Sequence, residues 1–205
     1  MNTRLSIRSW CTIKGRSAYS NNTLLYAAET PDCADFLVAL YRHLGTDYPK
    51  FYKMDQLSKL GWLASEFLLQ TQPMPPHIAP EAVGLVVMNA HSSLDTDRKY
   101  LDSVRTVASP GLFVYTLPNI LLGEICIRRG LKGENAFFIF PEFDAAFLQE
   151  YVTALFAAAD FQACICGWVD LLGEEIDAAL FLVTRDPGPL AFTAEQLDIV
   201  YSKTF

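Results

Sequence analysis

The side chains that could carry out chemistry are few in this chain of 205 residues, which has three histidines and five cysteines. His91 stands out because it follows an apolar run typical of a central strand, and ligand sites in α/β proteins lie beyond the carboxyl ends of such strands. Ser92 and Ser93 follow it directly. A histidine beside serines suggests nucleophilic catalysis, but the Gly-x-Ser-x-Gly pattern of a nucleophile elbow is absent. An ordinary loop histidine is the favoured interpretation, and an acid or base at His91 is the alternative.

The candidate metal ligands are too scattered to predict a metal site. Cys164 and Cys166 are the only close pair of cysteines, and no second cluster accompanies them. If they lie in a strand, both thiols point to the same face, where free cysteines behave as small buried hydrophobic groups. Asp95 and Asp97 form a second pair, which we interpret as solvated charges at the start of a helix. We therefore expect no metal and no other cofactor.

Composition and charge exclude several classes of protein. Apolar residues make up 51% of the chain and the formal net charge is −7, with no long run of Lys and Arg, so nucleic acid is not an expected partner. No segment has the roughly 18–20 apolar residues that a membrane span needs. Residues 1–10 lack the apolar run of a signal peptide, and five scattered cysteines do not indicate a disulfide framework. These features predict a cytoplasmic protein.

The elements that must position the candidate residues alternate between strands and helices. Apolar periodicity predicts strands over 5–13, 83–88, 136–140, 163–169 and 178–183, and helices over 32–44, 54–69, 120–129 and 143–158. The segment 92–104 is polar and reads as a helix or a loop, whereas 71–80 holds four prolines and predicts a rigid loop. The alternation favours an α/β domain over residues 1–205, with helices packed on a mixed sheet of about five strands.

Four stretches stand in a characteristic order along the chain. They are an aspartate-led helix in 51–69, a Ser-Pro start leading to an asparagine in 109–119, a helix end with a GLKG turn in 123–135, and the segment ACICGWVD in 163–170. In this order the chain resembles the N-terminal half of the β-ketoacyl synthases, which are condensing enzymes of the thiolase fold. It is most similar to the ketosynthase-like proteins of aryl-polyene and flexirubin-type pigment clusters. The resemblance implies one half of a thiolase-like fold.

The chain departs from this family at the catalytic residues. In the family a nucleophilic cysteine follows the strand after the GLxGP turn, and counting from Gly130 places Glu142 there. No cysteine lies between Cys126 and Cys164, and a thiol is needed to take the acyl group as a thioester. The family's catalytic histidines belong to its C-terminal half, whereas this chain ends where the first half ends. The resemblance therefore implies no condensing activity for the chain alone.

Glu142 has two interpretations at this position. It can cap the predicted helix 143–158, where free backbone N–H groups stabilise a carboxylate. It can also be the acidic counterpart of the amide that replaces the cysteine in chain-length factors and decarboxylating ketosynthases. In that role it would orient a malonyl-type substrate.

The predicted strand 136–140 is unusually aromatic. In condensing enzymes the corresponding strand pairs with its copy in the partner subunit, so the resemblance implies an interface made by Ala136, Phe137, Phe138, Ile139 and Phe140. An exposed edge of this composition would aggregate unless another chain covered it. The alternative is that these side chains belong to the core.

A basic group at Arg128, Arg129 and Lys132 is the candidate surface for an acidic acyl carrier protein. The alternative is that these cations stabilise the carboxyl end of a helix through its dipole. The net charge of −7 argues against a surface for acidic partners.

Taken with the resemblance, these features predict a non-catalytic, chain-length-factor-like subunit supporting fatty-acid, polyketide or polyene synthesis. Its partner would be a full-length ketosynthase or a second copy of the chain. One alternative is a small enzyme acting on acyl or malonyl thioesters, with Glu142 or His91 as acid or base. The other is a module that binds an acyl carrier protein.

Overall fold

A computed structural model describes residues 5–30, 32–158 and 160–203. The predicted domain also includes residues 1–4, 31, 159 and 204–205, which lie outside the described part. The described strands form one eight-stranded mixed sheet in the order β3-β2-β1-β7-β6-β4-β5, with β8 paired to the start of β1. The strands are β1 (Ser6–Lys14), β2 (Ser17–Ser20), β3 (Thr23–Ala27), β4 (Val83–Asn89), β5 (Asn135–Ile139), β6 (Ala163–Leu172), β7 (Glu175–Thr184) and β8 (Leu190–Ala191).

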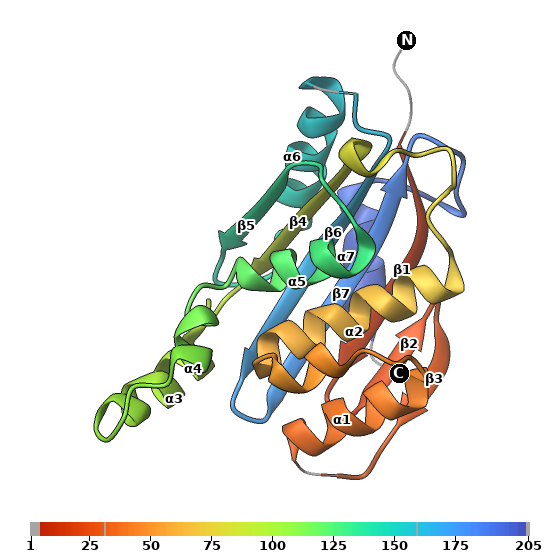
Figure 1. Cartoon of the computed structure of the whole chain (residues 1–205). Helices are drawn as coiled ribbons and strands as arrows, with labels where there is room; N and C mark the ends of the chain where they lie inside the picture. Colours follow the sequence, from red (N-terminus) through yellow and green to blue (C-terminus); the bar gives the residue numbers. More distant parts are fainter. Residues whose placement is uncertain (1–4, 31, 159, 204–205) are drawn as a thin grey trace.

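Helices cover both faces of this sheet, which gives three layers (Figure 1). One face carries α1, α2 and α5, and the other carries α6 and α7, each packed on its own apolar cluster. The helices are α1 (Cys33–Leu44), α2 (Gln56–Thr71), α3 (Leu94–Val104), α4 (Pro110–Val114), α5 (Ile120–Arg129), α6 (Ala145–Ala158) and α7 (Ala194–Ser202), with 3-10 turns η1 (Pro49–Lys53) and η2 (Pro80–Ala82).

Local chemistry accounts for the ends of the helices. Asp32 accepts a hydrogen bond from the backbone N–H of Asp35 at 2.9 Å and so begins α1. Asp55 caps α2 in the same way, through the N–H of Ser58 at 2.9 Å. Helices α1 and α5 both end at a glycine in the left-handed conformation, Gly45 and Gly130, as their sequences predict.

Strand β4 lies next to the edge strand β5, is buried along its whole length and runs parallel to both β5 and β6. The connection from β4 to β5 packs α5 on one face of the sheet, and the connection from β5 to β6 packs α6 on the other. Adjacent parallel strands with connections on opposite faces form a topological switch point, where α/β proteins bind ligands. The carboxyl ends of β4, β5 and β6 are therefore the place to search for a site.

The predicted α/β architecture with a mixed sheet is confirmed, and it is larger than the five strands expected. Strands β1, β4, β5, β6 and β7 were predicted, but β2, β3, β8 and the final helix α7 were not. Each unpredicted strand has only two to five residues, too few for an alternating pattern to be distinctive. The polar segment 92–104 is mostly helical, as α3.

Candidate functional site

The carboxyl ends of β4 and β6 bring together His91 and Asp170, which are 79 positions apart in the sequence. The Nδ1 atom of His91 lies 2.7 Å from Oδ2 of Asp170. The other carboxylate oxygen of Asp170 accepts hydrogen bonds from the backbone N–H groups of Ala90 at 3.1 Å and His91 at 3.0 Å. One carboxylate therefore fixes both the backbone and the ring of the histidine.

The side chain of Asn89 stabilises the loop that carries His91. The side chain of this buried residue accepts a hydrogen bond from the N–H of Ser92 and donates one to its carbonyl oxygen, both at 2.9 Å. These contacts hold Ser92 at a φ of 52°, which few non-glycine residues adopt. Ser93 connects the loop to the segment after α4, because its hydroxyl donates to the carbonyl oxygen of Thr116 at 2.8 Å. The loop is thus built to hold the histidine in place.

The contact between His91 and Asp170 determines what the ring can do. A carboxylate beside Nδ1 favours the tautomer with its proton there, which leaves Nε2 as the acceptor. The imidazole is 40% exposed, whereas the carboxylate is only 14% exposed. The pair can therefore take a proton at Nε2 from a group in solvent while the partly buried carboxylate stabilises the resulting cation.

A second polar group beside this pair comes from the last helix. The hydroxyl of Tyr201 donates to Asp177 at 2.5 Å, and the ammonium of Lys14 lies 3.3 Å from the same carboxylate. Burial raises the pKa of Tyr201, and its bond to Asp177 and the charges of Asp170 and Glu142 raise it further. Tyr201 is therefore a hydrogen-bond donor here. The sequence offered no signal for it, because α7 was not predicted.

Glu142 is exposed between β5 and α6 and does not cap the helix, so that prediction was wrong. Helix α6 begins at Ala145, and the capping carboxylate is Asp144, which accepts the N–H of Phe147 at 2.8 Å. The predicted helix began two residues too early, because Phe143 fits the apolar pattern of the helix that follows it. That ring instead packs against Tyr201, with their centroids 4.3 Å apart.

Four of the five cysteines are buried in the core, and Cys126 on α5 is partly exposed. Cys164 and Cys166 are buried in the same cluster under α6, as their spacing predicts. Burial raises the pKa of Cys166, and the neighbouring Cys164 raises it further. A thiol in this state is a poor nucleophile, because the thiolate is the reactive form.

The predicted interface strand lies at the edge of the sheet. Strand β5 pairs with β4 and ends the strand order of the described sheet. The side chains from Ala136 to Phe138 are half-buried, and Ile139 is 52% exposed. Phe138 packs against Phe147 and Tyr151, each at 4.9 Å between ring centroids, so part of the aromatic character belongs to the core. Phe140 follows the strand, and its N–H donates to Asn89.

Helices α3 and α4 form an arm that projects from the same end of the sheet (Figure 1). The described part of the chain has eleven exposed large hydrophobic side chains, and six of them lie on this arm. Val107 is 82% exposed at its tip. The six are Leu101, Val104, Val107, Phe113, Val114 and Leu117. We call this arm together with β5 the apolar flank. The sequence gives no clear signal for the arm, because its apolar residues fit no single helical face.

The predicted basic group sits in the last turn of α5 and just beyond it. Arg128 and Arg129 both contact the buried carboxylate of Glu66, at 3.3 and 2.8 Å. Lys132 lies 3.3 Å from Glu81 at the surface. All three cations thus have acidic partners within the chain, and their contact with a carrier protein remains a prediction.

Asp95 and Asp97 lie in the first turn of α3, as predicted, but they are not simply solvated. Asp95 is 2.6 Å from Lys99, and its carboxylate also accepts the N–H of Gly173 at 3.2 Å. Asp97 accepts the hydroxyl of Ser93 at 3.1 Å. Within residues 5–30, 32–158 and 160–203 no group of three or more His, Cys, Asp or Glu side chains could hold a metal ion.

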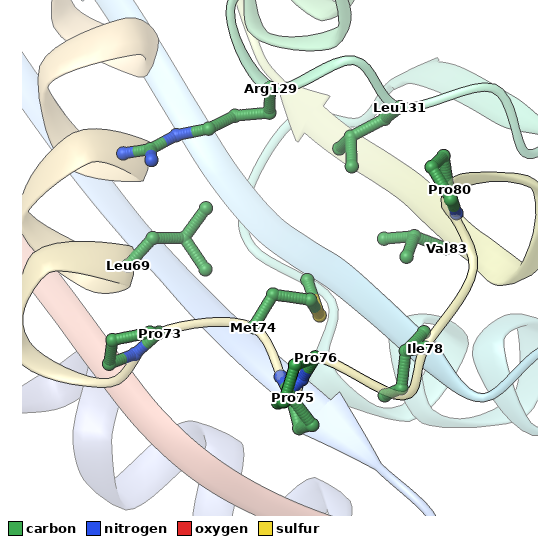
Figure 2. A pocket seen from close by; sticks show the side chains of 10 residues that line it. All are labelled: Leu69, Pro73, Met74, Pro75, Pro76, Ile78, Pro80, Val83, Arg129 and Leu131. Carbon is green, nitrogen blue, oxygen red and sulfur yellow. The ribbon is translucent and has the colours of Figure 1, made fainter.

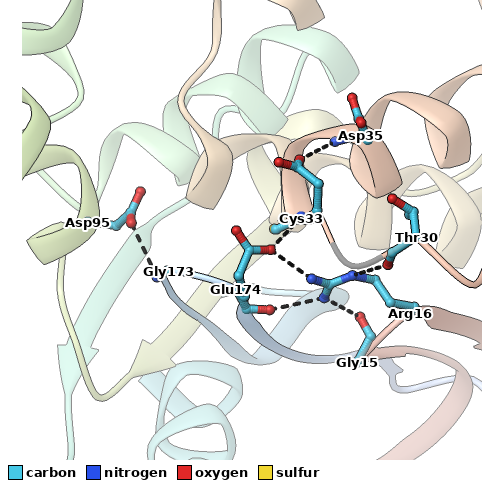
Figure 3. Close-up of polar contacts among 9 residues, drawn as sticks. Gly15, Arg16, Thr30, Cys33, Asp35, Asp95, Gly173 and Glu174 are labelled. Atoms are coloured by element: carbon cyan, nitrogen blue, oxygen red, sulfur yellow. Dashed lines mark hydrogen bonds and ion pairs between the residues drawn. The ribbon is translucent and has the colours of Figure 1, made fainter.

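A neighbouring polar cluster has a structural role (Figure 3). The guanidinium of Arg16 contacts the carboxylate of Glu174 at 2.9 Å, and donates to the carbonyl oxygen of Thr30 at 3.1 Å. The same carboxylate accepts the N–H of Cys33 at 2.7 Å. The cluster ties the turn between β6 and β7 to the first turn of α1.

No described helix is long and apolar enough to cross a membrane.

Comparison with solved structures defines the class of this fold. The ishigamide ketosynthase/chain length factor superposes with a TM-score of 0.61 at 17% identity, over 88% of this chain and 62% of that one. A ketosynthase in complex with its chain length factor from Xenorhabdus doucetiae gives a TM-score of 0.56 at 12% identity, over 90% of this chain and 80% of that one. The chain therefore has a ketosynthase-like, thiolase-type fold, as its sequence predicts.

A third similar structure is a type II polyketide synthase acyl-carrier protein in complex with its ketosynthase, at a TM-score of 0.60, 15% identity, and coverage of 88% and 62%. The chain spans about three fifths of the length of most of these structures. No protein-family model and no curated protein matches the sequence.

Proposed function

We propose that this chain is a non-catalytic, chain-length-factor-like subunit that forms a heterodimer with an active ketosynthase in polyketide or related polyene or fatty-acid synthesis. The observation that carries the proposal is the apolar flank. Its exposed side chains gather on one arm and one edge strand rather than being scattered, and apolar patches of this kind mark interaction surfaces.

The edge strand supplies a second kind of contact on this flank. The backbone groups of β5 that face away from β4 are not paired with another described strand. Such an edge is a template for a strand of another chain, and Ile139 adds an exposed apolar side chain there. A partner that covers both the edge and the arm would bury apolar area, which is the main driving force for association.

The partner is assigned from the fold and from the chemistry of the chain. Two of the similar structures are described as a ketosynthase with its chain length factor. The position after β5 holds Glu142 rather than a thiol, and the buried cysteines cannot replace it. A ketosynthase-like subunit without its nucleophile needs an active partner to serve condensation. An active ketosynthase therefore fits the flank better than a second copy.

The test begins with an affinity pull-down of the tagged protein from its host, which identifies the ketosynthase that it retains. The two pure proteins are then mixed and analysed by size-exclusion chromatography with light scattering. We expect a 1:1 complex. The double variant Val107→Asp/Phe113→Asp and the variant Ile139→Asp should each weaken it at least tenfold.

Ile127→Asp is the matched control, because Ile127 is 67% exposed on α5, outside the flank. This variant should leave the complex unchanged. A homodimer that excludes the ketosynthase, or a complex that tolerates the arm and strand variants, would contradict the proposal.

The pairing of His91 with Asp170 favours a second candidate function, the hydrolysis of acyl thioesters. Nε2 of His91 would take a proton from water as the oxygen attacks the thioester carbonyl, and the proton would pass to the departing thiolate. Hydrolysis of acyl- or malonyl-pantetheine by the pure protein should then fall at least a hundredfold in His91→Asn. His77→Asn is the control, because His77 is an exposed loop histidine outside this site. A pure protein without turnover would exclude this function and leave the first untouched.

A further inference from the structure

A pocket of about 300 Å³ lies at the amino end of β4, whereas His91 follows its carboxyl end. Figure 2 shows the side chains that line the pocket. It is bordered by the end of α2, the proline-rich loop, the end of α5 and the first residue of β4. Its wall is mostly hydrocarbon, contributed by Leu69, Pro73, Met74, Ile78, Val83 and Leu131. This volume is at the lower limit of small-molecule sites, which span roughly 300–1,000 Å³.

The walls of the pocket are pre-formed. Four prolines restrict the backbone of the loop, and the N–H of Ile78 donates to the carbonyl oxygen of Pro75 at 3.0 Å. The carbonyl oxygen of Pro80 accepts the N–H of Lys132 at 3.0 Å, which ties the loop to the segment after α5. A rigid pocket loses little conformational entropy when a ligand binds.

One charged side chain breaks the hydrocarbon wall. Arg129 extends from the end of α5 along the pocket towards α2 (Figure 2). Its guanidinium shares the single carboxylate of Glu66 with Arg128, so the group carries one excess positive charge. The Nε–H of Arg129 is buried and donates to no described residue. Partial burial strengthens the attraction of such a group for an anion.

We propose that this pocket binds the carboxylate of a saturated aliphatic acid of about six to eight carbon atoms. The chain would lie against the proline-rich loop and Leu131, and the carboxylate would lie at Arg129, where it would balance the excess charge. The pocket is separate from the apolar flank and from His91, so the proposal does not depend on the proposed function.

The test is calorimetric titration of the whole protein with octanoate, and in parallel with 1-octanol, which has the same chain length and no charge. We expect octanoate to bind with a dissociation constant below 1 mM and at least tenfold more tightly than octanol. Equal binding of the two would overturn the role of Arg129. The absence of octanoate binding up to 5 mM would overturn the site itself.

Two variants locate the binding. Met74→Trp fills the pocket and should abolish octanoate binding, whereas Leu117→Trp adds the same ring on the exposed arm and should not change it. Arg129→Met should weaken octanoate at least tenfold and leave octanol unchanged. Octanoate binding that persists in Met74→Trp would overturn the proposal even if Arg129→Met fails to fold.

Discussion

Two arginines share one buried carboxylate, that of Glu66. Glu66 lies within α2 with its side chain only 5% exposed, and it is held by two arginines from the end of α5. Arg128 also lies over the ring of Tyr48 at 5.0 Å and donates to the hydroxyl of Thr46 at 2.9 Å. Removing one member of such a group leaves the others desolvated and unpaired.

We therefore expect Glu66→Ala to lower the free energy of unfolding by about 2–3 kcal/mol, below the full cost of a buried pair because both arginines keep about a quarter of their side chains exposed. Chemical denaturation with urea measures this. Glu81→Ala is the control, since its pair with Lys132 is solvent-exposed and its loss should change the free energy of unfolding much less than the loss of Glu66. Equal losses in the two variants would show that Glu66 is not a structural centre.

At the scale of elements, two acidic residues between β5 and α6 compete for the role of helix cap. Glu142 and Asp144 are both acidic and both precede the helix, and only the backbone path distinguishes them. Asp144 meets the free N–H of Phe147, and its own carbonyl oxygen accepts the N–H of Leu148 at 3.0 Å. Glu142 remains exposed and is free to meet a partner or a substrate.

Asp144→Ala should therefore lower the free energy of unfolding by about 1 kcal/mol through loss of the helix cap. Glu142→Ala should change it by less than about 0.5 kcal/mol, as expected of an exposed side chain. Thermal unfolding followed by circular dichroism compares the two. A larger loss of stability in Glu142→Ala than in Asp144→Ala would show that Glu142, and not Asp144, caps α6.

At the scale of the whole molecule, the sheet separates three regions. The carboxyl ends of β4 and β6 hold the pair of His91 and Asp170, the edge at β5 continues into the exposed arm, and the amino end of β4 borders the pocket. The core between them contains most of the thiols. Burial raises the pKa of Cys33 to about 11 and raises that of Cys11 further.

This arrangement predicts the pattern of thiol alkylation at pH 8. Only Cys126 is partly exposed, so iodoacetamide should modify it first, and the other four should react only when the protein unfolds. Peptide mass spectrometry measures the modification at each site. Cys126→Ala should abolish the early reaction. Rapid alkylation of Cys166 in the native protein would contradict a purely structural role for the thiol pair.

The sequence by itself determined the order of the main elements and their layer architecture, because apolar periodicity and end signals such as Gly45 and Gly130 act within a few residues. It also determined that no thiol lies in the segment between β5 and α6. It marked His91, Arg128 and Arg129, yet it could not show their partners.

Only the tertiary structure decided those partners. Asp170 is 79 positions from His91 in the sequence, and the two meet because β6 pairs with β4. Glu66 is 62 positions from Arg128, and the two meet because α2 packs on α5. The exposed arm, the edge position of β5 and the pocket beside Arg129 also arise from packing between distant segments. The physical reason is that local periodicity specifies an element and its apolar face, whereas strand order and helix docking decide which distant side chains meet.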